Sequence, residues 1–181
     1  MVGKFKPPST SNYHPSAPIY FYKVDREHGC FSNFSPHPIE LSGKTWATVE
    51  HYYQAHKFLG TKFEYLMAEI HTAPTPEIAA QIGRKLEHQP HPKWCLHKPE
   101  VMYRAVRQKF TTHADIRDIL LATTGHEIIE DSPVDYFWGC GLDGSGQNYL
   151  GQILMQVRAE IGTDLWIDRL PIIMLGDGDT K

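Results

Sequence analysis

The chain of 181 residues is long enough for one domain with a sizeable core, and 41% hydrophobic with 12% aromatic residues is typical of a soluble globular protein. A net charge of −3 and a pI of about 6.4 argue against a sequence-independent electrostatic grip on nucleic acid, but leave room for a small basic pocket that holds one phosphate. Cys30, Cys95 and Cys140 are too widely spaced to indicate a disulfide framework or a zinc ribbon.

The two ends differ in composition from the middle of the chain. Residues 1–18 are rich in proline and serine, so we expect a mobile tail before a domain at 19–162 and a C-terminal extension at 163–181. The apolar stretch 165–175 either docks on the domain or contacts a partner. The first residues lack the apolar core of a signal peptide, and no apolar run approaches a membrane span. We therefore expect a cytoplasmic or nuclear protein.

Three segments predict strands. Residues 19–24 are aromatic and β-branched, and residues 38–46 predict a hairpin that turns at Ser42 and Gly43. Residues 126–131 predict a further short strand.

Helices dominate the rest of the chain. Thr48 is placed to cap one helix, and Thr75 followed by Pro76 marks the start of another. Further helices are predicted over residues 61–71, 98–110, 113–125 and 149–162. The pattern predicts an α+β fold, a compact and mainly helical single domain with a small sheet.

The helix after Thr48 carries apolar residues around most of its circumference. At about 100° per residue, Glu50, Gln54 and Lys57 share one narrow arc. An all-round apolar helix is expected to be buried, and a buried carboxylate and amine need a partner or a polar pocket. The arc is either an ordinary solvated stripe or one wall of a reactive cleft.

Three other segments combine polar and aromatic groups. In residues 29–36, Phe31 and a second phenylalanine bracket Ser32 and Asn33, either as a turn or as part of a site. The Arg84 side chain is either solvated or placed to make a bidentate contact with a phosphate. Trp94 follows a proline-rich loop and is either a stacking platform for a base or a core anchor.

The loop of residues 133–148 places Asp135 and Trp138 before several glycines and a predicted helix. Such a loop is either a structural turn or an anion site, in which Gly144 and Asn148 lie near a substrate phosphate. The dinucleotide, Walker A and EF-hand patterns all fail here. Because paired Cys and His spacings are also missing, we expect neither a metal nor a cofactor.

Together these segments resemble the NADAR, or YbiA-like, family. The resemblance rests on FYKVDREHGCFSNFSPHPIELSGKTWATVEHYYQAHKF, IGRK, KPEVMYRAVRQKF and DYFWGCGLDGSGQNYLGQILMQVR, and covers roughly residues 19–160 in the family's order. The family's motif residues correspond here to Asn33, Glu50, Lys57, Arg84, Trp94, Asp135 and Trp138. The loop around Trp94 is a variable part of the family.

The resemblance implies hydrolysis of the N-glycosidic bond between ribose and an exocyclic amine. It implies two substrate classes, which are ADP-ribose on guanine bases of nucleic acid and small ribosylaminopyrimidine phosphates of riboflavin biosynthesis. Glu50, Lys57 and Asp135 are then the candidate catalytic residues. The remaining candidates, as substrate-binding residues, are Phe31, Ser32, Asn33, Arg84, Trp94, Trp138, Gly144 and Asn148.

Two mechanisms fit these residues. Lys57, with its pKa lowered by burial near Tyr53 and Phe58, can form a Schiff base with ring-opened ribose while Glu50 moves protons. Alternatively, water attacks an oxocarbenium-like centre with help from Glu50 or Asp135. A module that only binds ADP-ribose or NAD, and a protein-interaction domain, are the competing classes, of which the shared arc of Glu50 and Lys57 favours the enzyme.

Overall fold

The protein is described here by a computed structural model, which covers residues 16–169. Most of its regular structure is helical, and the strands are few and short. In chain order the elements are β1 (Ser16–Phe21), the 3-10 helix η1 (Gly29–Phe31), β2 (Ile39–Leu41), β3 (Lys44–Trp46), α1 (Val49–His56), α2 (Leu66–His71), α3 (Pro76–Arg84), α4 (Trp94–Thr112), α5 (Ala114–Ala122), β4 (His126–Glu130) and α6 (Tyr149–Arg169). The predicted α+β class is confirmed.

The described strands form two separate pairs. β2 and β3 are the predicted hairpin, and Ser42 and Gly43 turn it with φ values of 55° and 71°, as a two-residue I′ turn requires. β1 pairs in parallel with β4, so that Phe21 lies opposite Glu130. This second pair joins segments more than 100 residues apart and brings the end of β4 beside the segment after β1.

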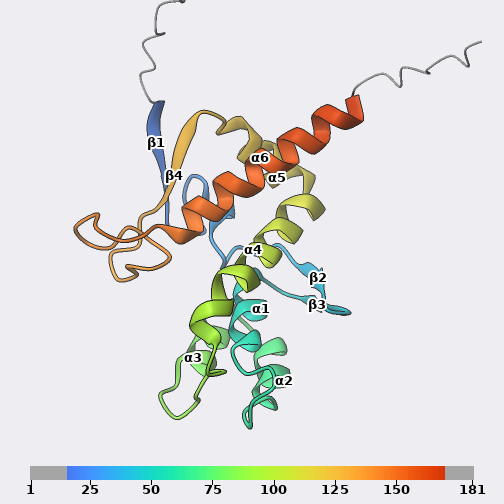
Figure 1. Cartoon of the computed structure of the whole chain (residues 1–181), viewed down its shortest axis with the longest axis vertical. Helices are drawn as coiled ribbons and strands as arrows, with labels where there is room; N and C mark the ends of the chain where they lie inside the picture. The colour runs from blue at the N-terminus through green and yellow to red at the C-terminus, as the bar shows by residue number, and fades with distance from the viewer. Residues whose placement is uncertain (1–15, 170–181) are drawn as a thin grey trace, which may run out of the picture.

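Helix α4 lies at the centre of the fold (Figure 1). It packs against α1 on one side and against α5 and α6 on the other, and α6 in turn packs on β4. Its buried residues Met102, Val106 and Phe110 join these parts into one apolar core. The core therefore runs through the molecule along α4, and the cavity described below opens beside it.

Several elements differ from their predicted limits. The first strand runs over Ser16–Phe21, because only this stretch pairs with β4. α2 begins at Leu66, since Thr61 bonds to the Phe58 carbonyl and to the Phe63 amide and holds residues 61–65 in turns.

Two helices are longer than predicted. α4 begins one turn early, at Trp94, and α6 continues to Arg169. Of the tail predicted at residues 1–18, residues 16–18 belong to β1 instead, and the rest lies outside the described residues, as does the part of the apolar stretch beyond residue 169.

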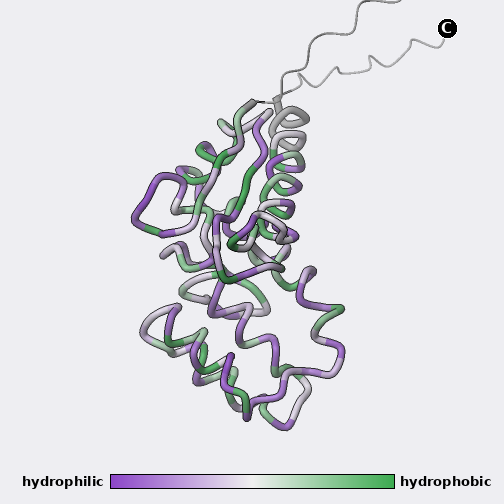
Figure 2. Tube along the Cα trace, turned by 90° about the vertical axis from the view of Figure 1, so that its left-hand side faces the viewer, coloured by the Kyte–Doolittle hydropathy of each residue, from purple (hydrophilic) through white to green (hydrophobic). Residues whose placement is uncertain are grey.

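Figure 2 shows the hydrophobic residues as short stretches interrupted by hydrophilic ones. Within residues 16–169, no helix combines the length and the hydropathy needed to cross a membrane.

Candidate active site

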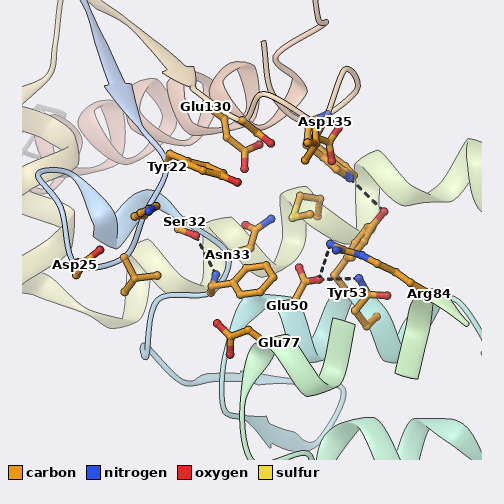
Figure 3. A pocket seen from close by; sticks show the side chains of 18 of the residues that line it. Tyr22, Asp25, Ser32, Asn33, Glu50, Tyr53, Glu77, Arg84, Glu130 and Asp135 are labelled. Carbon is orange, nitrogen blue, oxygen red and sulfur yellow. Dashed lines mark hydrogen bonds and ion pairs between the residues drawn. The ribbon is translucent and has the colours of Figure 1, made fainter. Parts of the chain in front are cut away.

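A cavity of about 730 Å³ opens between α1, α3 and the loop that follows β4 (Figure 3). Its volume falls in the range of about 300–1,000 Å³ that is usual for small-molecule sites. Its walls come from six parts of the chain: Tyr22, Lys23, Val24 and Asp25 after β1; Ser32, Asn33 and Phe34; Glu50, Tyr53, Gln54 and Lys57 of α1 and its end; Glu77 and Arg84 of α3; Met102 of α4; and Glu130, Ser132, Val134, Asp135 and Trp138 at the end of β4 and after it.

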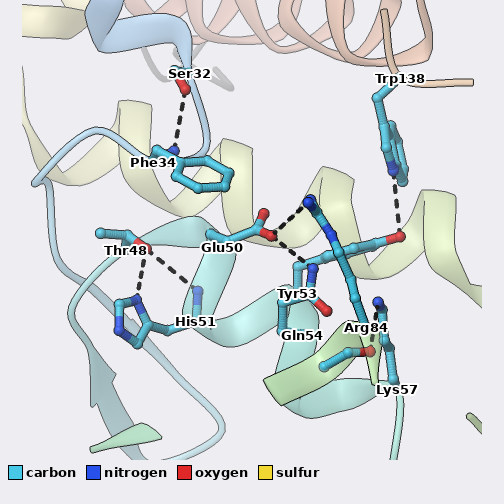
Figure 4. A network of polar contacts seen from close by, with 11 residues as sticks. Ser32, Phe34, Thr48, Glu50, His51, Tyr53, Gln54, Lys57, Arg84 and Trp138 are labelled. Carbon is cyan, nitrogen blue, oxygen red and sulfur yellow. Dashed lines mark hydrogen bonds and ion pairs between the residues drawn. The ribbon is translucent and has the colours of Figure 1, made fainter. Parts of the chain in front are cut away.

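Helix α1 carries Glu50 into the cavity wall. The Thr48 hydroxyl caps the helix by accepting a bond from the amide of His51 at 3.3 Å, as predicted. The buried Glu50 carboxylate accepts a 2.6 Å bond from Gln54 Nε2, and a nitrogen of Arg84 lies 3.6 Å from the same oxygen (Figure 4). Burial raises the pKa of Glu50, while Gln54 and Arg84 oppose this rise.

Lys57 follows the last turn of α1 on the same wall. Its Nζ donates to the Gly83 carbonyl at 3.2 Å and lies 5.6 Å from the centre of the Tyr53 ring. Burial lowers the pKa of Lys57 to about 8, although the Glu50 carboxylate opposes this shift. A Cβ at position 83 would collide with the Gln54 amide, so glycine lets α3 approach this wall. The arc of Glu50, Gln54 and Lys57 is therefore a cavity wall and not a solvated stripe.

The loop with Ser32 and Asn33 is held from two sides. The Asn33 carbonyl accepts a 3.1 Å bond from the amide of Glu50. Nζ of Lys109, which is only 1% exposed, donates to the Ser32 carbonyl at 2.9 Å and to Ser35 Oγ at 2.6 Å. Asn33 Oδ1 is buried without a hydrogen-bond partner among the described residues. The loop thus holds Asn33 in the cavity wall, with a buried acceptor that has no partner among the described residues.

Asp135 and Trp138 form the opposite part of the wall. One oxygen of Asp135 accepts bonds from the amides of Phe137 at 2.9 Å and Trp138 at 2.7 Å, which fixes the turn before the indole. Trp138 Nε1 donates to the Tyr53 hydroxyl at 3.3 Å, and the two rings meet edge to face. Asp135 therefore shapes the loop in addition to facing the cavity.

Trp138→Ala is expected to lower the free energy of unfolding by about 3–5 kcal/mol, because the indole is 9% exposed and packs against Tyr53. Trp138→Phe keeps an aromatic ring and loses the hydrogen bond to Tyr53, so it is expected to cost less stability. Its main expected effect is a higher KM, because the smaller ring stacks more weakly on a base. Denaturant unfolding and steady-state kinetics measure the two effects. An unchanged unfolding midpoint in Trp138→Ala would contradict the core role.

Two predicted binding residues lie in the core instead. Phe31 is fully buried between Phe21 and Phe110, with ring centres 5.7 and 5.9 Å away. Trp94 is the first residue of α4, is 8% exposed, and packs on Tyr53 at 5.2 Å. Neither belongs to the cavity wall. Their aromatic rings serve as anchors for the segments on either side, which corrects the expectation that they contact substrate.

The glycine-rich loop after Trp138 is structural rather than an anion site. The amides of Tyr149 and Leu150, at the start of α6, donate to the carbonyls of Phe137 and Trp138, at 3.0 and 3.1 Å. These amides are therefore not free to bind a phosphate. Gly144 closes a turn through a 3.4 Å bond from its amide to the Gly141 carbonyl, has a φ of 77° and lies outside the cavity wall.

Asn148 also has a structural role. Its Oδ1 accepts from the Glu130 amide at 3.0 Å, and its Nδ2 donates to the Ile128 carbonyl at 2.9 Å. The side chain thus ties the start of α6 to β4, and the predicted direct contact with substrate is not supported. It acts on the cavity indirectly, through the placement of Glu130.

Sequence reasoning missed Glu130, which faces the cavity from the end of β4. A signal for it exists in the strand period. Residues i and i+2 of a strand share a face, so Glu130 lies on the same face as Ile128, which is fully buried. Glu77 and Met102 were also missed, and no local pattern separates them from ordinary helix residues. Among residues 16–169, no three His, Cys, Asp or Glu side chains are grouped as metal ligands.

Comparisons with known proteins point in one direction. The NADAR domain family matches residues 20–162. An N-glycosidase from Nostoc punctiforme is 54% identical over 143 residues, which cover 79% of this chain and 92% of that protein. The N-glycosidase YbiA of Escherichia coli is 40% identical over 146 residues, which cover 81% of this chain and 89% of that protein.

Longer proteins and a solved structure are similar too. The chloroplastic riboflavin biosynthesis protein PYRR of Zea mays is 45% identical over 166 residues, which are 85% of this chain and 26% of that protein. The NMR structure of E. coli YbiA has a TM-score of 0.76 and 39% identity, covering 84% of this chain and 88% of that one. The family match includes every residue that lines the cavity.

Proposed function

This chain belongs to the NADAR family, and we propose that it is a hydrolase that cleaves the N-glycosidic bond between ribose C1 and an exocyclic amine. Relatives named N-glycosidases, which this chain matches over 92% and 89% of their lengths, support this class of reaction. The observation that carries the proposal is the pairing of a buried carboxyl, Glu50, with an amine of lowered pKa, Lys57, on one wall of one cavity.

The geometry favours catalysis over simple binding. A module that only holds ADP-ribose needs ring contacts and cations, and Trp138 and Arg84 would be enough for that. Burying Glu50 and lowering the pKa of Lys57 costs free energy that binding alone does not require. Such shifts bring an acid–base group and a nucleophile closer to working pH.

We propose that the ribosyl-amine is ADP-ribose attached to a guanine base. A cavity of about 730 Å³ has room for more than a ribose and its amine. Arg84 supports recognition of a diphosphate, because its side chain is 63% exposed and reaches from solvent to Glu50. Lys23, which also lines the cavity, offers a second cation.

A second candidate is a small ribosylaminopyrimidine phosphate. It is favoured by the names of two similar proteins, the Zea mays protein and a riboflavin biosynthesis protein of Vibrio vulnificus. This chain covers only 26% and 38% of those proteins, so their names describe longer chains. Both substrates share the bond that is broken, and the two candidates differ in what the rest of the cavity holds.

The proposed reaction proceeds through Lys57. Opening of the ribose ring breaks the bond between C1 and the ring oxygen and gives an imine of the exocyclic amine. Neutral Lys57 adds its nitrogen to C1, and departure of the exocyclic amine leaves a lysine Schiff base. Water then adds to C1 and releases free ribose and Lys57, with Glu50 transferring protons. Water attack without the Schiff base, assisted by Glu50 or Asp135, is the alternative route.

The test is product release from defined substrates. The protein is incubated with ADP-ribosylated guanosine, an ADP-ribosylated oligonucleotide and a ribosylaminopyrimidine phosphate, and mass spectrometry follows the freed sugar and base. We expect release from the ADP-ribosylated guanine substrates. Release from the pyrimidine alone would favour the second candidate. Tight binding of ADP-ribose without release from any substrate would contradict the proposed function and leave a binding module.

A further inference from the structure

Glu130 is a half-buried residue whose side chain faces the cavity and whose Oε2 atom is buried without a partner among the described residues. Its Oε2 has neither exposed surface nor a hydrogen-bond partner within residues 16–169. Figure 3 shows the side chain pointing from β4 into the cavity, across from Glu50 on α1. An unpaired buried carboxyl is costly, and such a group in a binding cavity is available for a ligand.

The backbone holds Glu130 firmly at this place. Its amide donates to Asn148 Oδ1 at 3.0 Å, and its carbonyl accepts from the amide of Cys140 at 2.9 Å. On the other side, the β1 pairing sets it opposite Phe21. These contacts use only the main chain of Glu130, so they fix its position and leave the carboxyl group free to act in the cavity.

The surroundings of the two glutamates differ in charge. Burial raises the pKa of Glu50, but Gln54, Arg84 and Lys57 lie beside it and favour its ionised form. Glu130 has the carboxylates of Asp135 and Glu50 as its charged neighbours, and burial together with these charges raises its pKa to about 8. Glu130 therefore carries a proton at neutral pH, and two carboxyl groups with different roles face one cavity.

We propose that Glu130 is the general acid that protonates the exocyclic nitrogen as its bond to ribose C1 breaks. This inference rests on the proposed function and adds a catalytic residue to it. A general acid must hold its proton at working pH and face the leaving group. With Lys57 and Glu50 on the α1 wall, a ribose bound between the walls presents its leaving amine to β4.

The step is balanced in atoms and electrons. The carboxyl proton of Glu130 moves to the exocyclic nitrogen, and the electron pair of the C1–N bond stays on that nitrogen, which leaves as a neutral amine. In the same step the lone pair of Lys57 Nζ forms the second bond of the C1=Nζ Schiff base, or, in the alternative route, a lone pair of the water oxygen forms the new C1–O bond. The added water gives up its proton to Glu50 and then to solvent, and Glu130 regains a proton from solvent.

The test uses whichever ribosyl-amine the wild-type protein cleaves. Glu130→Gln keeps the shape and removes the acidic proton, so kcat is expected to fall by about 10²–10⁴-fold with KM and melting temperature nearly unchanged. The matched control is Glu127→Gln, because Glu127 lies on the same strand, undergoes the same substitution and is exposed. This control is expected to keep wild-type rates.

A rescue experiment separates acid catalysis from mere positioning. Glu130→Ala leaves room near the cavity, and added formate is expected to restore part of its lost rate. Two results would overturn the general-acid role while the proposed function stands. One is a Glu130→Gln variant whose rate is within about threefold of the wild-type rate. The other is a loss of rate in Glu130→Ala that formate does not restore. A wild-type protein that cleaves no ribosyl-amine would overturn the proposed function and this inference together.

Discussion

Lys57→Arg is expected to lower kcat by roughly 10⁴-fold or more, as the loss of a nucleophile does. Arginine keeps a positive charge at this wall but forms no imine with ribose. A lysine that served only to hold the Gly83 carbonyl at 3.2 Å would tolerate arginine with modest loss. The matched control is Lys62→Arg, because Lys62 is exposed and outside the cavity wall.

Reduction with borohydride tests whether Lys57 forms a covalent intermediate with ribose. Reduction during turnover is expected to trap ribose on the protein, and peptide mapping is expected to place the adduct on Lys57. Lys109 is the internal comparison, because burial lowers its pKa as well, to about 7. Its amine is enclosed behind the cavity wall, where it donates to the Ser32 carbonyl and to Ser35 Oγ, and Lys109 itself does not line the cavity. Failure to trap ribose, together with an active Lys57→Arg, would favour direct attack by water.

The pH dependence of the rate follows from the same lysine. The pKa of Lys57 lies near 8, so its neutral, nucleophilic fraction grows about tenfold per pH unit below that value. We therefore expect kcat/KM to rise between pH 6 and pH 8 in the wild-type protein. A rate that is flat over this interval would argue against neutral Lys57 as the attacking group.

Glu50→Gln is expected to lower kcat by about 10²–10⁴-fold while ADP-ribose still binds. Glutamine can keep an oxygen for the 2.6 Å bond from Gln54, so the wall is expected to keep its shape. What is lost is the group that transfers protons and the charge that faces Arg84. Calorimetric titration with ADP-ribose and single-turnover kinetics separate binding from chemistry.

The control for Glu50 is Glu69→Gln on α2, which makes the same change at an exposed helix position. Its rate is expected to equal that of the wild type. A Glu50→Gln variant with near-full turnover would exclude Glu50 from the chemistry and leave Asp135 as the candidate base. A variant that lost both turnover and ADP-ribose binding would show that Glu50 organises the wall instead.

Local signals in the sequence determined where some helices begin and where the hairpin turns, because a capping residue or a turn residue stands at each of these points. Thr48 caps α1, Thr75 and Pro76 begin α3, and Ser42 with Gly43 turns the hairpin. Each of these signals acts within a few residues, so the sequence contains it completely. The helical period likewise placed Glu50 and Lys57 on one arc.

Only the tertiary structure decided which polar and aromatic residues reach the cavity. The parallel pairing of β1 with β4 brings Glu130 across from Glu50, and no local period encodes a contact between segments so far apart. Phe31 and Trp94 read as contact residues in the sequence, yet their neighbours bury them. The physical reason is that burial and pairing depend on what packs against a side chain, and that is set by the whole fold and not by the residue's own segment.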